Sequence, residues 1–140
     1  MSDHILNVSI VTPQTTAYTG PALAVSVPGS KSPFQVLYNH APIISSLDTG
    51  VIKIEDPSNQ VSYYASREGF VEVLNNTISI VVNELMSASA VDVAAAEADY
   101  ADSREKADTL PDRHQRDLAR KEVHWAEARL RAAKLQREHA

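Results

Sequence analysis

The most constraining feature of the sequence is a period-two alternation of apolar and polar residues between about residue 4 and residue 82. Leu6, Val8 and Ile10 alternate with polar residues, and the segments 23–27, 52–54, 71–73 and 78–80 continue the pattern. Such alternation places the apolar side chains of a strand on one face. The sequence therefore predicts a β-sandwich or barrel of eight to ten short strands over this region.

Turn-forming residues separate the predicted strands. They occur at Thr19-Gly20-Pro21, Pro28-Gly29, Asp56-Pro57-Ser58-Asn59 and Asn75-Asn76. The densest turn region is 27–50, which holds three of the seven prolines and two of the four glycines. Two polar loops, at 29–33 and 38–42, flank short apolar runs there. We interpret this region as a corner of the β-domain that presents its loops at the surface.

The composition changes near Met86, where an alanine-rich segment begins. Alanine has the highest helix propensity. Ser89, followed by Asp92 three residues later, resembles a capping box at the start of a helix. Thr109-Leu110-Pro111 ends this helix, and a second helix is expected from about Asp112 to near Glu138. The predicted organisation is a β-domain at residues 1–86 and an αα-hairpin at residues 87–140.

Both predicted helices carry a narrow apolar seam. In the second helix it recurs at intervals of 4, 3, 4 and 3, and consists of Ala119, Val123, Ala126, Leu130 and Ala133. The first helix offers a similar seam, made of Ala94, Ala98 and Ala101. Because alanine buries little apolar area, we expect the hairpin to dock weakly on its own β-domain and to be movable.

Charge is divided unevenly along the chain, whose net charge is −5. Residues 1–110 hold 5 basic and 13 acidic side chains, whereas residues 111–140 hold 8 basic and 5 acidic ones. This asymmetry suggests that the two parts meet different surroundings. The basic residues are interleaved with acids and have few aromatic neighbours, so no nucleic-acid partner is expected.

Several kinds of site are not expected from the composition. There is no cysteine, and the five histidines have no tight ligand spacing, so no metal site is predicted. No nucleophile motif is present, so no catalytic activity is expected of the chain itself. No apolar run approaches the ~20 residues of a membrane span, so contact with a membrane is expected to be indirect.

Motifs spread over the β-part resemble, in their order, the epsilon subunit of rotary F-type ATP synthases. They are Val11-Thr-Pro, Tyr18-Thr-Gly, His40-Ala41-Pro42, Gly50-Val-Ile-Lys-Ile and Ala65-Ser-Arg-Glu-Gly69. The alanine-rich hairpin is similar to that of the family in length and composition. The resemblance implies a mainly β fold with added α: an antiparallel β-sandwich of about ten strands followed by a C-terminal αα-hairpin.

The resemblance also implies a non-catalytic rotor subunit of the central stalk, which binds the gamma subunit and the c-ring and couples ion-driven rotation to ATP synthesis. It implies a hairpin that inhibits ATP hydrolysis by reaching the catalytic alpha and beta subunits. The expected location is peripheral, on the cytoplasmic face of an energy-transducing membrane.

Site residues follow from the same resemblance. The residues expected to face the c-ring are Ser30, Lys31, Ser32, Asn39 and His40. The cations expected to contact the catalytic subunits are Arg116, Arg120, Arg129, Arg131 and Lys134. Some members bind ATP through Asp, two residues, Arg and Ala; here Asp92 is kept, but Ala95 replaces the arginine, so no ATP cofactor is expected.

A second hypothesis remains open at this point. A β-sandwich with a helical oligomerisation arm could be a binding module for a sugar or a peptide. Such a module would need exposed aromatic residues gathered in a groove, whereas Phe34, Tyr38, Tyr63, Tyr64 and Phe70 mostly fall within strand patterns.

Overall fold

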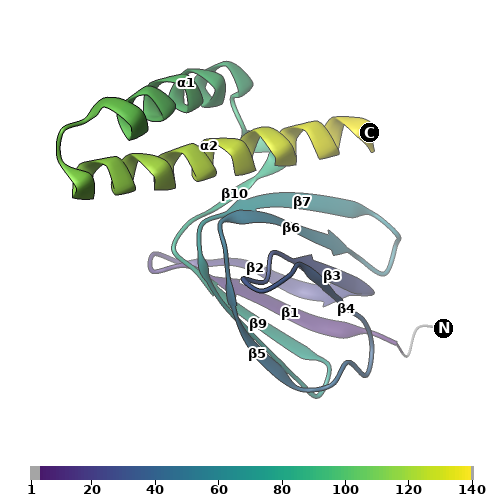
Figure 1. Cartoon of the computed structure of the whole chain (residues 1–140). Coiled ribbons are helices and arrows are strands. Elements are labelled where there is room, and N and C mark those ends of the chain that lie inside the picture. Colours follow the sequence, from purple (N-terminus) through teal and green to yellow (C-terminus); the bar gives the residue numbers. More distant parts are fainter. Residues whose placement is uncertain (1–3, 140) are drawn as a thin grey trace.

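The computed structural model describes residues 4–139 and has ten strands in two five-stranded sheets, followed by two long helices (Figure 1). The first sheet has the order β2 (Thr16–Ala22), β1 (Leu6–Val11), β9 (Thr77–Val82), β8 (Gly69–Leu74) and β5 (Ile43–Leu47). The second has the order β10 (Leu85–Ser87), β7 (Val61–Ser66), β6 (Gly50–Glu55), β3 (Ala24–Val27) and β4 (Phe34–Val36). The predicted sandwich with a C-terminal hairpin is confirmed.

The core lies between the two sheets and is built from the alternating apolar residues. Leu6, Val8 and Ile10 of β1 are buried, as are Ile78 and Ile80 of β9. β1 and β9 pair in parallel, whereas the other strand pairs are antiparallel. The period-two pattern therefore identified the inward face of these strands correctly.

Asparagine forms the tight turns. Asn75 and Asn76 join β8 to β9 with φ angles of 50° and 62°, the left-handed pair that a type I′ hairpin turn requires. The turn predicted at Thr19-Gly20-Pro21 is wrong, because these residues lie inside β2 and pair with β1. β2 is an edge strand, so no neighbouring strand on its open side needs the N–H that Pro21 lacks.

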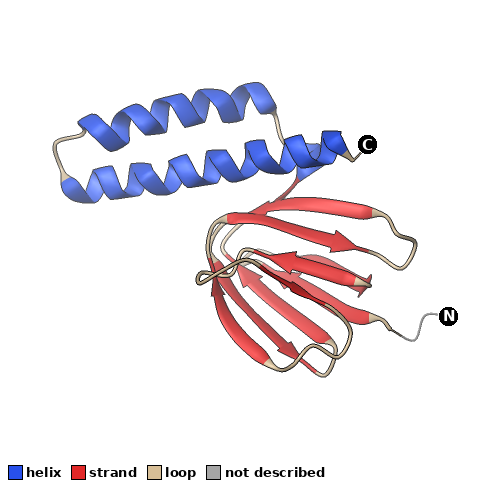
Figure 2. Cartoon of the chain, turned by 45° about the vertical axis from the view of Figure 1, so that its right-hand side comes forward, coloured by secondary structure: helices blue, strands red, loops and turns tan. Residues whose placement is uncertain are grey.

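Two antiparallel helices lie on one side of the sandwich (Figure 2). A short 3₁₀ turn, η1 (Ala88–Ala90), leads into α1 (Val93–Thr109), and α2 (Arg113–Glu138) follows. The Asp112 side chain caps α2 by accepting from the Gln115 N–H at 3.1 Å. α1 is capped by Asp92, not by Ser89 as predicted, because Ser89 belongs to the 3₁₀ turn.

The helix–helix seam was predicted correctly on only one helix. On α2, Ala119, Ala126 and Ala133 are buried as expected. On α1 the predicted Ala94, Ala98 and Ala101 are exposed, and the buried residues are Ala96, Ser103 and Ala107. Alanines occur on all sides of α1, so the sequence offered no contrast by which to choose the buried face.

The sandwich is covered by a second face of α2. Trp125, Ala128 and Ala132 pack with Tyr63 and Ala65 of β7 in one buried cluster. Ala88 of the 3₁₀ turn joins the same cluster. α2 therefore lies between α1 and the surface formed by β7 and β6.

Candidate functional site

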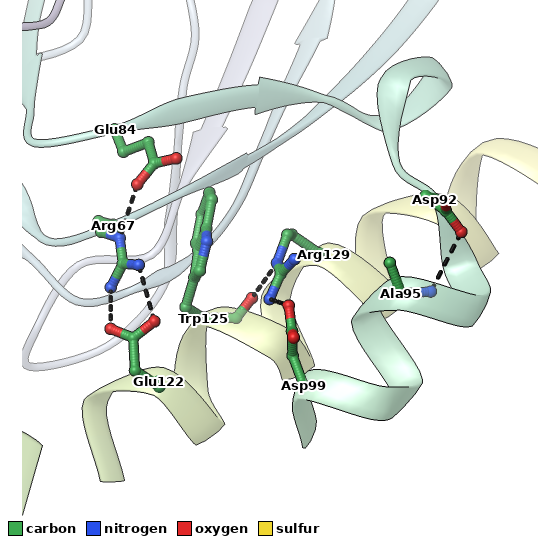
Figure 3. A network of polar contacts seen from close by, with 8 residues as sticks. All are labelled: Arg67, Glu84, Asp92, Ala95, Asp99, Glu122, Trp125 and Arg129. Atoms are coloured by element: carbon green, nitrogen blue, oxygen red, sulfur yellow. Dashed lines mark hydrogen bonds and ion pairs between the residues drawn. The ribbon is translucent and has the colours of Figure 1, made fainter. Parts of the chain in front are cut away.

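The hairpin is joined to the sandwich by a polar cluster around Arg67, in the turn between β7 and β8 (Figure 3). The Arg67 Nε donates to Glu84 at 2.9 Å, from the turn before β10. Its two terminal nitrogens donate to the carboxylate of Glu122 on α2, at 2.9 and 3.0 Å. A paired contact of this kind fixes orientation as well as distance, so it sets where α2 lies on the sandwich.

Trp125, the single tryptophan of the chain, lies beside this ion pair. The Arg67 guanidinium is 4.9 Å from the centre of its ring, and the Arg129 guanidinium is 5.3 Å from it. Figure 3 shows the ring between the two arginines. Because only 4% of Trp125 is exposed, these cation–π contacts form where water is largely excluded, which strengthens them.

Arg129 connects the two helices within the same cluster. It donates to the Asp99 carboxylate of α1 at 3.1 Å and to the Trp125 carbonyl oxygen at 3.4 Å. One group of side chains therefore links β7–β8, α2 and α1. We call Arg67, Glu84, Glu122, Trp125 and Arg129 the junction cluster.

The ion pair changes the protonation of both partners. Hydrogen bonding to Glu122 raises the pKa of the Arg67 guanidinium against the opposing effect of burial. Hydrogen bonding to Arg67 lowers the pKa of Glu122 from its ordinary value of 4.5. Because the Glu122 side chain is half-exposed, the pair contributes only about 1 kcal/mol to docking.

The opposite side of the sandwich carries an exposed apolar surface. On the outer face of the first sheet, Ile44, Phe70 and Val81 are 75%, 62% and 55% exposed. Phe70 and Val81 are directly paired across β8 and β9, and Val81 is paired with Val11 of β1. We call these four residues the apolar stripe. The helices lie against β7 and β6, away from this face (Figure 1).

The residues expected to face the c-ring fall into two loops. Ser30 lies beside the C-terminal end of β5, where its N–H donates to Ser46 and its hydroxyl donates to Asp48 at 2.9 Å. Lys31 and Ser32 continue this exposed loop. Asn39 lies beside the turn at the other end of β5, where its N–H donates to the Asn76 side chain at 2.6 Å.

His40 is the link between the two loops. Its ring lies 6.2 Å from the ring of Phe34, at the start of β4, and its Nδ1 contacts the Ala41 carbonyl oxygen at 2.7 Å. The five residues thus lie along one edge of the sandwich formed by β4 and β5, rather than in one compact cluster.

Comparisons with known proteins agree with this architecture. The family described as ATP synthase, Delta/Epsilon chain, beta-sandwich domain matches residues 5–88. The ATP synthase epsilon chain of Cyanothece sp. is 33% identical over 131 residues, which cover 91% of this chain and 94% of the relative. This chain belongs to the ATP synthase delta/epsilon family. The relatives that it matches over most of its length are named epsilon chains, which are stalk subunits and not catalytic themselves, as the sequence predicted.

Further relatives extend the comparison beyond cyanobacteria. The ATP synthase epsilon chain of Leptospira borgpetersenii is 35% identical over 95 residues, covering 68% of this chain and 74% of the relative. A chain in the cryo-EM structure of the Euglena gracilis mitochondrial ATP synthase, OSCP/F1/c-ring, superposes with a TM-score of 0.83 at 18% identity. That match covers 95% of this chain and 83% of the other, and it shows the shared fold.

Several of the cations that were predicted to contact the catalytic subunits have partners inside the hairpin of this epsilon subunit. Arg116 donates to the Leu110 and Pro111 carbonyl oxygens at 2.8 Å and so holds the connection between the helices. Arg120 pairs with Asp117 on its own helix, and Arg129 belongs to the junction cluster. Arg131 and Lys134 are exposed.

In this family member, Asp92 and Ala95, at the positions of the ATP-binding motif, form the N-terminal cap of α1. Asp92 accepts from the Ala95 N–H at 3.1 Å as the cap of α1, and Ala95 is exposed. Within residues 4–139 no three side chains are grouped as a metal site would require. None of the helices in the same range is long and apolar enough to cross a bilayer.

Sequence reasoning missed the junction cluster. Arg67 occurs within a family motif that implies no role for it, and its partner Glu122 is 55 residues further along the chain. The only local signals were an isolated arginine in an acidic region and a single tryptophan on an otherwise polar helix. Neither signal specifies a partner.

Breaking the junction is expected to loosen the hairpin. In Arg67→Gln, two carboxylates and the Trp125 ring lose their shared cation, so the ratio of docked to released hairpin should fall about fivefold, or ~1 kcal/mol. Trp125 fluorescence should shift to the red as water reaches the ring. Lys106→Gln is the matched control, because it removes only an exposed ion pair with Asp102 inside α1. An unchanged spectrum in Arg67→Gln would contradict the assignment.

Docking is also expected to weaken in acid. The pKa of Glu122 is lowered in the docked state, so its contribution is fully present above 4.5 and is lost as pH falls through the lowered value. The pKa of Arg67 is raised, so Arg67 stays charged throughout this range. Trp125 fluorescence followed from pH 7 downward should show a red shift that is smaller in Glu122→Gln. Equal shifts in the two proteins would remove Glu122 as the group responsible.

Proposed function

We propose that this epsilon subunit is a rotor part of the central stalk that couples ion-driven rotation of the c-ring to ATP synthesis, and that its hairpin inhibits ATP hydrolysis when it leaves the sandwich. The observation that carries the proposal is the construction of the hairpin–sandwich junction. One polar cluster around Arg67 and one apolar cluster around Trp125 and Tyr63 hold two long helices on the sandwich. Such an interface can open without disturbing the sandwich core.

The core of the sandwich supports a separate mechanical role for this part. The buried core cluster is made of strand residues alone, with no contribution from the helices. Two packed sheets resist deformation because interiors are close-packed. The sandwich can therefore stay attached to the stalk and transmit torque whichever position the hairpin takes.

Two surfaces are suited to the stalk partners. We assign the apolar stripe on the first sheet to the gamma subunit, because exposed apolar side chains of this size mark protein interfaces. We assign the polar edge with Ser30, Lys31, Ser32, Asn39 and His40 to the loops of the c-ring. The subunit would then be peripheral to the energy-transducing membrane, on its cytoplasmic face.

The hairpin is suited to the catalytic alpha and beta subunits once it is released. Release would leave Arg120, Arg131 and Lys134 exposed on α2, whereas Arg129 would keep its ion pair with Asp99, because both residues belong to the hairpin. A row of cations steers a helix toward an acidic surface and fixes its orientation there. Arg116 would keep its role in the connection between the helices, because its partners are carbonyl oxygens of that connection.

Removing the hairpin is the direct test of inhibition. A chain ended at Ser87 keeps all ten strands, because β10 is the last of them. In the reconstituted synthase, ATP hydrolysis should rise severalfold with this shortened chain. Arg67→Gln should act in the opposite direction and lower hydrolysis, since it favours the released hairpin. Lys106→Gln should match the natural chain; a shortened chain without effect would leave the hairpin with a role in assembly only.

The gamma contact can be tested on the apolar stripe. Phe70→Ser should weaken binding to the purified gamma subunit by at least tenfold, because burial of a phenylalanine contributes about 2 kcal/mol. Surface plasmon resonance would measure the affinity. Leu118→Ser is the control, since Leu118 is similarly exposed but lies on α2. If only Leu118→Ser weakens binding, gamma contacts the hairpin side instead.

A further inference from the structure

The C-terminal half of α2 lies over an open cleft instead of a close-packed surface. The cleft has a volume of about 540 Å³. The sandwich contributes the β3–β4 connection and strands β6 and β7, and α2 contributes the opposite wall. The side chains used below are Pro28, Pro33, Lys53, Tyr63, Arg131 and His139.

Two cations enter this cleft from opposite sides. Lys53 comes from β6, and Arg131 comes from α2. Neither is in an ion pair within residues 4–139, and no acidic residue lines the cleft. The acids nearest in sequence, Glu55 on β6 and Glu127 and Glu138 on α2, lie outside the lining, although the charge of Glu138 reaches Tyr63. Like charges that face each other across an interface oppose its closure, so this end of the hairpin lacks the compensation that Arg67 receives at the other end.

The cleft also offers neutral donors. Tyr63 is buried, its ring lies 5.5 Å from the His139 ring, and its side chain makes no hydrogen bond within the described residues. Burial and then the charge of Glu138 raise the pKa of the Tyr63 hydroxyl, which therefore remains a donor. Guanidinium, ammonium and hydroxyl groups together match the oxygens of a phosphate. Tyr63 is only 3% exposed, so its ring offers no free face for a nucleobase.

We propose that this cleft binds a small phosphate-class anion, with inorganic phosphate and pyrophosphate as the simplest forms, between Lys53 of the sandwich and Arg131 of the hairpin. The site exists only when the hairpin is docked, because each part supplies one cation. By linkage, the anion stabilises the docked hairpin to the extent that it binds the docked form better. This regulatory meaning rests on the proposed function; the binding itself does not.

Binding is tested on the full chain, without the synthase. Calorimetric titrations with phosphate, pyrophosphate and ATP at constant ionic strength should show saturable binding of pyrophosphate. Lys53→Gln and Arg131→Gln should each weaken it about tenfold, the effect of losing one charged hydrogen bond. Lys134→Gln is the matched control, because Lys134 is an exposed cation of α2 outside the cleft, and it should bind within twofold of the natural chain.

The three ligands distinguish the source of the phosphate group. Equal or weaker binding of ATP relative to pyrophosphate would support a site for a small anion. Tighter ATP binding that survives Lys53→Gln would overturn the proposal, as would the absence of saturable binding. These outcomes do not depend on ATP hydrolysis, so they are separable from failure of the proposed inhibition.

A second readout uses the charge repulsion. Without a multivalent anion, Lys53→Gln should move Trp125 fluorescence to the blue, because it removes one of two opposed cations and favours docking. Pyrophosphate should produce the same blue shift in the natural chain and little further shift in Lys53→Gln. A red shift in Lys53→Gln would show that Lys53 holds the hairpin down unaided, and would overturn the bridging role of the anion.

Discussion

The placement of the hairpin depends on the guanidinium group of Arg67. It satisfies two carboxylates, from Glu84 and Glu122, and faces the ring of Trp125 at 4.9 Å. The surrounding apolar contact combines Trp125 and Tyr63 with small alanines and with the half-buried Val51, Val61, Met86 and Leu135. A paired guanidinium–carboxylate contact has a defined geometry. Arg67 therefore contributes more to the orientation of the hairpin than to the strength with which it is held.

This arrangement keeps the equilibrium of the hairpin adjustable. A change of about 1 kcal/mol alters the ratio of two states roughly fivefold, and a half-exposed ion pair contributes on that scale. The half-exposed Glu122 leaves the docked state sensitive to charge, salt and ligands at the junction.

The sequence predicted the sandwich well because its signal is local. Alternation in β1, β6, β8 and β9 identifies the inward side chains without knowledge of any partner strand. The pairing of strands is not local, so the parallel contact of β1 with β9 could not be read in advance. The misplaced turn at Gly20-Pro21 has a similar cause, because only the position of β2 at a sheet edge makes a proline acceptable there.

The hairpin was predicted less completely because its contacts depend on contrast between residue types. The second helix has larger residues on one seam; the alanines of that seam are buried as predicted, whereas Val123 and Leu130 are only half-buried. The first helix is rich in alanine all round, and its buried face was misassigned. The face formed by Trp125, Ala128 and Ala132 was not predicted. Three apolar residues at intervals of 3 and 4 do not stand out in the sequence of a charged helix.

Release divides the junction cluster between the two parts of the chain. Arg129 keeps Asp99 and the Trp125 ring, because all three belong to the hairpin, whereas Arg67 stays on the sandwich with Glu84 and loses Glu122. The released hairpin therefore carries a Glu122 carboxylate without its cation and a Trp125 ring that no longer packs on Tyr63 and Ala65. A partner has to replace these contacts as well as attract the exposed cations of α2. Acidic complementarity in the partner is thus not sufficient for release by itself.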